Sequence, residues 1–247
     1  MGQGPTEPED RHPVRALWAV PRSASTAFER MMIERGDHAV LDEPFSAVYY
    51  HGPDRRSPRF PETEPDATVP AIIAEVEALA ASGPVFVKDM AYHPGPALDA
   101  LLGAWNSTFL IRDPRWSIPS MARIWPDMTD EEAGFTALSR AVETLRAAGT
   151  EPLVIDSHDL CREPEAVVGA WCDTMGLAAA PDALTWESGM RPEWERWRDW
   201  YGATSRSSGF LAPPDGSPPA PQDARIAALV ERNLPVYEEL RTACLVP

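Results

Sequence analysis

The sequence is poor in cysteine and has no long apolar run, and each shortage excludes a class of protein. Its three cysteines, Cys161, Cys172 and Cys244, are widely separated and form no CxxC pair. This spacing supports neither a disulfide framework nor a zinc site, so we expect free thiols in a reducing cytoplasm. No apolar stretch reaches the ~18 residues of a membrane span, and the first residues lack the basic and apolar regions of a secretory signal. We therefore expect a cytoplasmic protein without a membrane partner.

Positive charge is also scarce. The chain has 22 lysines and arginines against 38 aspartates and glutamates, a formal net charge of −16. A field of this sign repels polyanions, which argues against nucleic acid as a partner, yet a few local cations can still hold a small anionic cofactor. Lys88 is the only lysine among these cations. Coding bias toward arginine explains the general rarity of lysine, and Lys88 becomes a candidate for a specific role.

Strand-like and helix-like segments alternate along the chain. This pattern predicts an α/β fold, with a central parallel sheet of about five strands flanked by helices on both faces. We expect one domain over residues 14–247 after a disordered tail over 1–13, with mobile loops near 51–68 and 202–222 that are rich in proline. The expected strands are 14–20, 38–42, 85–88, 108–111 and 153–155. The expected helices are 25–35, 69–82, one after Pro114, 129–148, 164–175 and 223–241.

The loop after the first strand has the character of an anion site. Its sequence, PRSAST at 21–26, stands between a strand and a helix, where free backbone N–H groups and the helix dipole favour negative charge. Arg22 adds a guanidinium, and Ser23, Ser25 and Thr26 add hydroxyl donors. The loop lacks the glycines and the Lys-Ser or Lys-Thr pair of a nucleoside-triphosphate loop. A plain serine-capped turn is the alternative interpretation.

A second loop, FLIRDPRWSIPSM at 109–121, strengthens the anion-site interpretation. It consists of a strand ending in Arg112 and a helix that carries Ser120. Because the helix doubles back beside the strand, these two side chains can converge on one phosphate. We expect Arg22 and Arg112 to form two separate pockets of positive potential that hold opposite ends of one nucleotide.

The two loops, in this order, resemble those of sulfotransferases that use 3′-phosphoadenosine 5′-phosphosulfate (PAPS). In that family a first loop, typically PKSGTT, cradles the 5′-phosphosulfate, and an arginine followed eight residues later by a serine grips the 3′-phosphate. The segments VFVKDM at 85–90 and LVIDSHDLCREPEAVVGAWCDTMGL at 153–177 resemble further family segments. The similarity extends over about residues 15–210. It implies a P-loop-NTPase-like sulfotransferase fold, PAPS as cofactor with adenosine 3′,5′-bisphosphate as product, and no metal ion.

The resemblance also implies which residues bind PAPS. It assigns the 3′-phosphate to Arg112 and Ser120, and a late family segment similar to SRSSGF at 205–210 adds further contacts to that phosphate. Two departures stand in the first loop, Arg22 for the usual lysine and Ala24 for the usual glycine. Since alanine disfavours positive φ, we expect the turn to avoid it at Ala24. The 5′-phosphosulfate residues are Arg22, Ser23, Ala24, Ser25, Thr26 and Ala27, and the late contacts are Arg206, Ser208 and Gly209.

Sulfuryl transfer requires positive charge at the bridging oxygen and a base for the acceptor proton. Arg22 is the first candidate for the charge, and Lys88 is expected to reach the same cleft. In many members the base is a histidine two residues past the strand-three lysine, a position that Met90 occupies here. Glu43 is our first choice of base, with burial expected to raise its pKa; a cap role is the alternative. His93 is the second choice; packing against or capping a helix that starts near Pro96 is its alternative role.

Other features leave alternatives open. Asp89 is the third candidate base, or else a partner for Lys88. Trp194, Trp197 and Tyr201 are expected on one helical face, as core or as the wall of an acceptor or adenine pocket. The acceptor is expected to be a small molecule, neutral or hydrophobic, with a hydroxyl or amine. The sequence leaves open a monomer or a homodimer.

Two other functions fit parts of the pattern. An ATP-dependent phosphoryl transferase would need magnesium and lacks its Lys-[ST] pair here. A non-catalytic adenine-nucleotide-binding module would explain the missing strand-three histidine.

Overall fold

A computed structural model describes residues 11–213, 216–218 and 220–245, and it contains a five-stranded sheet. The order is β2-β3-β1-β4-β5, and every neighbouring pair is parallel. This confirms the predicted fold class. The strands are β1 Val14–Ala19, β2 Ala39–Asp42, β3 Val85–Met90, β4 Asn106–Ile111 and β5 Leu153–Asp156.

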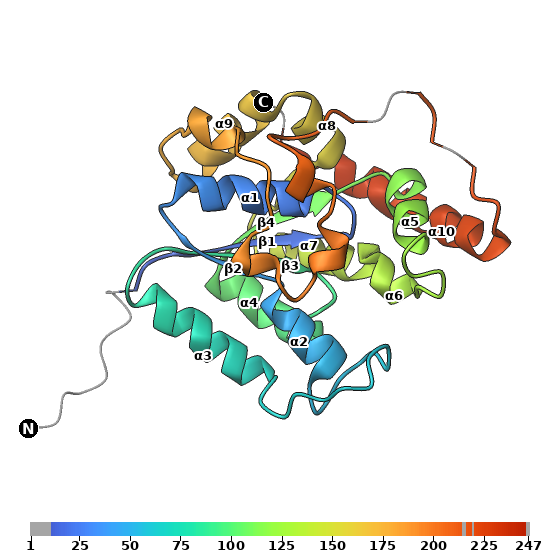
Figure 1. The fold of residues 1–247 in the computed structure, drawn as a ribbon, viewed down its shortest axis with the longest axis horizontal. Helices are drawn as coiled ribbons and strands as arrows, with labels where there is room; N and C mark the ends of the chain where they lie inside the picture. The colour runs from blue at the N-terminus through green and yellow to red at the C-terminus, as the bar shows by residue number, and fades with distance from the viewer. Residues whose placement is uncertain (1–10, 214–215, 219, 246–247) are drawn as a thin grey trace, which may run out of the picture.

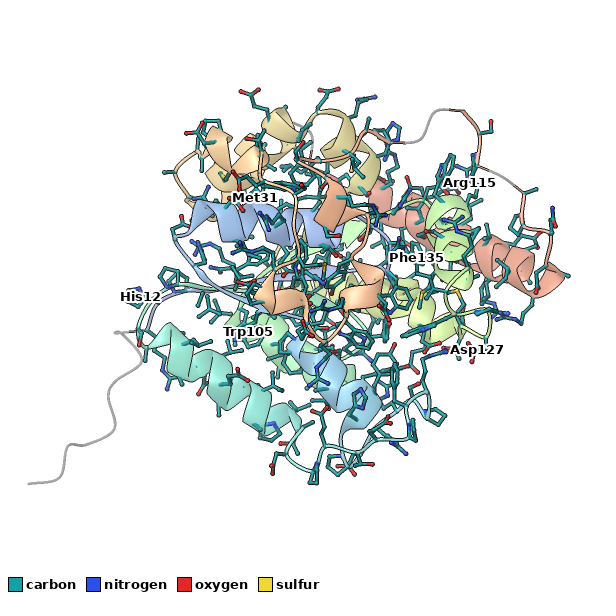
Figure 2. All side chains as sticks on the ribbon, in the orientation of Figure 1. His12, Met31, Trp105, Arg115, Asp127 and Phe135 are labelled. Atoms are coloured by element: carbon teal, nitrogen blue, oxygen red, sulfur yellow. The ribbon has the colours of Figure 1, made fainter. Side chains whose placement is uncertain are left out.

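Helices cover both faces of the sheet (Figure 1). Successive side chains of β1 point to opposite faces of the sheet. Leu17 packs in the hydrophobic cluster with α1 and α9, and Trp18 packs in the hydrophobic cluster with α3, α4 and α7. Figure 2 shows Met31 on the first side and Trp105 on the second. The helices are α1 Ser25–Arg35, α2 Pro44–His51, α3 Val69–Ala80, α4 Leu98–Ala104, α5 Pro114–Ala122, α6 Asp130–Ala133, α7 Phe135–Ala147, α8 Ser157–Arg162, α9 Pro164–Met175 and α10 Ala224–Arg241.

The predicted helix over 129–148 is wrong, because the chain breaks at Gly134 into α6 and α7. Gly134 has φ of 85°, a conformation that glycine adopts without strain. A β-carbon at this position would lie 3.2 Å from Cδ of Pro21, in the first loop. The break therefore lets α6 and α7 pack closely against the first loop. Helices α2 and α8 were not predicted.

The expected aromatic helix face is also wrong. Residues 192–206 form three short 3₁₀ helices, Pro192–Trp194, Arg198–Trp200 and Thr204–Arg206, and no α-helix. We call residues 192–212 the cap segment. Trp194 is fully buried, whereas Trp197 and Tyr201 are buried and also line a cavity. The aromatic residues thus serve as both core and wall.

The loop over 52–68 contains no helix or strand, as predicted for its part of 51–68. Arg59 fastens it to the body: its guanidinium lies 4.1 Å from the centre of the Trp125 ring and bonds both oxygens of the Glu132 carboxylate. Its mobility, like that of 202–222, stays a prediction. Residues 1–10 of the predicted tail, and residues 214, 215 and 219, lie outside the described residues. No helix in the described ranges is both long and apolar enough to cross a bilayer.

Candidate active site

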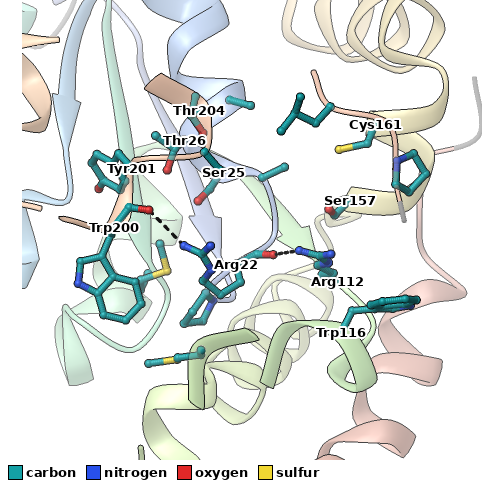
Figure 3. A pocket seen from close by; sticks show the side chains of 18 of the residues that line it. Arg22, Ser25, Thr26, Arg112, Trp116, Ser157, Cys161, Trp200, Tyr201 and Thr204 are labelled. Atoms are coloured by element: carbon teal, nitrogen blue, oxygen red, sulfur yellow. Dashed lines mark hydrogen bonds between the residues drawn. The ribbon is translucent and has the colours of Figure 1, made fainter. Parts of the chain in front are cut away.

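The site lies where the two predicted loops meet. Strands β1 and β4 are neighbours, and the helices that follow them, α1 and α5, pack into the clusters on opposite faces of the sheet. Such a divergence opens a crevice at the carboxyl ends of the strands. A cavity of about 420 Å³ occupies this crevice, and both loops and the cap segment line it (Figure 3).

The first loop turns through two residues of positive φ. Arg22 has φ of 62° and Ala24 has φ of 67°, so the expectation that Ala24 avoids positive φ is wrong. This conformation costs a non-glycine residue roughly 1–2 kcal/mol. In return the turn leaves the amide N–H groups of residues 23–26 without an acceptor among the described residues. Successive free N–H groups in such a turn form an anion-binding concavity.

The hydroxyls of this loop divide into two groups. Ser25 and Thr26 line the cavity, as does Ala27, and Figure 3 shows the two hydroxyls on the same side as Arg22. Ser23 is fully buried and donates its hydroxyl to the carbonyl of Val20 at 2.7 Å. Its side chain therefore holds the turn together and does not line the cavity.

The two arginines lie against each other, and the expectation of two separate pockets is wrong. Arg112 donates from Nη1 to the carbonyl of Arg22, and both side chains line one cavity (Figure 3). Arg22 donates to the carbonyl of Trp200 at 3.2 Å and to Oγ of Ser120 at 3.3 Å. Ser120 is therefore a partner of Arg22, and it does not line the cavity. Burial lowers the pKa of each arginine, and neither forms an ion pair within the described part of the chain.

In the late segment only one of the three expected residues faces the cavity. Gly209 lines it, and so does Ser207, which was not expected. Arg206 packs its guanidinium beside Gly202, and the carbonyl of Ser208 accepts the N–H of Trp186. Neither Arg206 nor the Ser208 side chain lines the cavity, so those two expectations are not met.

Lys88 does not reach the cleft, contrary to expectation. Its ammonium is fully buried among three acids, with Nζ 2.5 Å from Asp42, 2.7 Å from Glu43 and 3.5 Å from Glu29. The carboxylates of Asp42 and Glu43 raise the pKa of Lys88 against the opposing effect of burial. Burial and the charge of Asp42 raise the pKa of Glu29. We call these four residues the lysine cluster.

The cap segment is fastened to this cluster. Tyr201 donates to the carboxylate of Asp42 at 2.8 Å, and its hydroxyl lies 3.1 Å from Oε1 of Glu43. Trp194 donates its indole N–H to Glu29 at 3.0 Å. Glu43 has φ of 47° and lines the cavity beside Tyr201, so its backbone is also strained. The cluster thus joins α1, β2, β3 and the cap at one point.

His93 lines the same cavity and pairs with Asp89. Nδ1 of the ring lies 2.6 Å from Oδ1 of Asp89, so Asp89 has His93 as its partner and not Lys88. Asp89 also accepts the backbone N–H groups of Phe45 and Met90, each at 2.8 Å. Burial and Glu43 raise the pKa of Asp89. Burial lowers the pKa of His93 to about 4, which leaves the imidazole neutral at pH 7.

Comparisons with known proteins identify the family. The model of the sulfotransferase domain family matches residues 14–244. The chain belongs to this family. Two curated proteins of Arabidopsis thaliana are also similar to this sulfotransferase domain, the branched-chain-amino-acid aminotransferase-like proteins 2 and 1. They are 30% and 29% identical over 91% and 96% of the chain. The chain spans about two fifths of the length of these relatives, 40% and 42%.

Two solved sulfotransferase domains are similar in structure. One comes from the olefin synthase of Synechococcus PCC 7002, with a TM-score of 0.47 and 14% identity over 93% of this chain and 98% of that one. The other comes from the curacin biosynthetic pathway, with a TM-score of 0.47 and 15% identity over 96% and 99%.

Sequence reasoning missed the far end of the cavity of this sulfotransferase domain. Ser157 and His158 follow β5 directly, so the rule that ligands bind at strand ends could have found them. Cys161 also lines this end, and burial raises the pKa of its thiol. Tyr237 and Arg241 reach this end from α10, and no local sequence pattern indicates that they line the cavity. In the described ranges no group of three or more His, Cys, Asp or Glu side chains could hold a metal ion.

Proposed function

We propose that this protein transfers the sulfuryl group of PAPS to a hydroxyl or amine of a small acceptor and releases adenosine 3′,5′-bisphosphate. The observation that carries the proposal is the pair Arg22 and Arg112. Two half-buried guanidinium groups, neither with a carboxylate partner among the described residues, stand beside a row of free N–H groups in one cavity. Unneutralised positive charge in a half-enclosed site favours a ligand with several negative charges.

The chain's own residues divide the work of holding this nucleotide. The N–H groups of residues 23–26 and the hydroxyls of Ser25 and Thr26 would bind the 5′-phosphosulfate at the start of α1. Arg22 would stabilise the charge that develops on the bridging oxygen, and Arg112 would hold a phosphate on the β4 side. Bound PAPS would supply the sulfuryl group and the leaving 5′-phosphate. Because these groups already provide positive charge, the proposed transfer needs no metal ion.

The other end of the cavity suits the acceptor. Tyr50, Met90, Tyr92, Trp125 and Trp197 line it, and its surface is mostly aromatic. Aromatic side chains of this kind can contact an apolar or neutral molecule, but they offer no positive charge to an anion. A small neutral or hydrophobic hydroxyl or amine compound therefore fits better than a nucleic acid or an acidic polymer.

Isothermal titration and a transfer assay test the proposal. We expect adenosine 3′,5′-bisphosphate to bind without magnesium, and ³⁵S-labelled PAPS to pass its label to at least one acceptor of a hydroxyl and amine panel. Binding of magnesium-ATP alone would instead favour phosphoryl transfer. Binding of the bisphosphate with no transfer to any acceptor would favour a non-catalytic module.

A further inference from the structure

His93 carries a buried polar atom that the fold leaves unused. Its side chain is about 1% exposed, and Nε2 has no hydrogen-bond partner within the described part of the chain. An orphaned polar atom of this kind costs roughly as much as a lost hydrogen bond. The ring lines the cavity while Nε2 is enclosed, so a ligand in the cavity can supply the missing partner when the aromatic side chains beside this atom shift.

The position of the ring is fixed from behind. Asp89 holds Nδ1 at 2.6 Å, and two backbone N–H groups hold the Asp89 carboxylate in turn. Both carboxylate oxygens act as acceptors, so we place the shared proton on Nδ1. Nε2 is then an acceptor with a free lone pair, and the carboxylate behind the ring can stabilise the imidazolium that forms when Nε2 takes a proton.

Glu43 is less free to act. One carboxylate oxygen, Oε1, already receives the ammonium of Lys88 at 2.7 Å and lies 3.1 Å from the hydroxyl of Tyr201. Moving this carboxylate toward an acceptor would leave the buried Lys88 short of countercharge. Glu43 therefore suits the role of an anchor for the cap segment better than that of a base.

The surroundings of His93 define what it can meet. Three tyrosines pack around the ring, with centroid separations of 5.4 Å for Tyr49, 5.4 Å for Tyr50 and 4.5 Å for Tyr92. The hydroxyls of Tyr50 and Tyr92 share one hydrogen bond at 3.2 Å. The ligand beside Nε2 must consequently present a donor to the imidazole and an apolar surface to the aromatic rings.

We propose that Nε2 of His93 is the catalytic base and that Asp89 is its positioning residue. The acceptor is an apolar or aromatic compound with an uncharged hydroxyl. This inference rests on the proposed function. The acceptor oxygen bonds to sulfur while the bond from sulfur to the bridging oxygen breaks. The electron pair leaves with the 5′-phosphate, the hydroxyl proton moves to Nε2, and solvent later removes that proton.

Nitrogen NMR on ¹⁵N-histidine protein tests the tautomer without any turnover. We expect the His93 resonances, identified by their loss in His93→Gln, to show a protonated Nδ1 and a bare Nε2 from pH 8 down to about pH 5. Asp89→Asn should redistribute the proton between the ring nitrogens. A protonated Nε2, or an imidazolium at pH 7, would overturn the proposal. The charged groups that act on His93 are Asp89, Glu43, Lys88, Glu131 and Glu132.

Turnover of probes that differ in acidity tests the base. For a weakly acidic alcohol of the panel, such as benzyl alcohol, His93→Gln should lower kcat by about 10²–10⁴-fold, the usual contribution of a general base. For 4-nitrophenol, which is largely ionised at pH 8, the loss should be far smaller. The bisphosphate should bind as in the wild type. His12→Gln is the matched control: His12 is exposed and lies at the edge of the fold opposite α10 (Figure 2).

The outcomes separate the two proposals. If His93→Gln keeps its alcohol turnover, or if Glu43→Gln loses as much with the same dependence on acceptor acidity, the base is not His93 while the proposed function stands. If the wild type sulfates no hydroxyl of the panel, the inference fails. If it also fails to bind the bisphosphate, the proposed function fails with it.

Discussion

Replacing Lys88 with methionine should severely destabilise the protein. Methionine has a similar length, so the change removes the ammonium and leaves little cavity. Glu29 has a raised pKa and can stay protonated, but Asp42 and Glu43 would lose a cation that lies 2.5 and 2.7 Å away in a fully buried site. Breaking a buried ion pair by removing one partner costs about 3–5 kcal/mol. For a domain of this size that corresponds to a Tm lower by about 6–20 °C.

The loss should depend on pH, and its sign follows from the charges. The pKa of Lys88 is raised in the folded wild type, so its contribution is fully present below its ordinary pKa and is constant between pH 5 and 8. Burial and Asp42 raise the pKa of Glu29, and in the variant the charge of Lys88 no longer opposes this rise. The folded variant then takes up protons as pH falls, and the difference from the wild type should shrink from pH 8 to pH 5.

Urea unfolding at pH 8 and pH 5 measures this prediction. The control is Arg11→Met, which breaks the pair with Glu77, where the two side chains are 55% and 47% exposed. An exposed pair of that kind is worth less than about 1 kcal/mol. A loss below about 1 kcal/mol for Lys88→Met, or a loss that is the same at both pH values, would refute the account of the lysine cluster.

Three further changes test other parts of the site. Ala24→Gly should raise the free energy of unfolding by roughly 1 kcal/mol in urea, because glycine adopts the positive φ without strain. Arg112→Ala should weaken binding of adenosine 3′,5′-bisphosphate by about 10–100-fold in titration calorimetry, whereas Arg115→Ala, which removes an exposed side chain from the first turn of α5, should leave it unchanged. Trp194→Phe should cost about 1–3 kcal/mol in urea unfolding, because the Glu29 carboxyl loses its buried donor.

The sheet and the two loops that follow β1 and β4 were predictable because their signals are local. Each strand is a short apolar run, Arg112 follows β4 directly, and Arg22 lies in the turn just after β1. Parallel strands bring their carboxyl ends to one edge, so the order of the segments was enough to place these loops together. Their fusion into one cavity was not predictable, since it depends on how the side chain of Arg112 lies against the backbone of the first loop.

The parts that sequence reasoning missed depend on contacts between distant segments. The partners of Lys88 come from α1, from the end of β2 and from the cap, and no spacing in the chain reveals that they meet. The break at Gly134 was hidden because the helical pattern continues on both sides of it. Alanine prefers negative φ, which is why a positive φ was not expected at Ala24. The packing of β1 and α1 overrides this local preference.

The burial of the one lysine makes the protein a chemical reporter of its own unfolding. Reagents that acylate amines find no lysine side chain on the folded surface, because Lys88 is the only one in the chain and is fully enclosed. A modified Lys88 would therefore record a molecule that had opened. Mass spectrometry of that single peptide could count opening events without a fluorophore or an engineered tag.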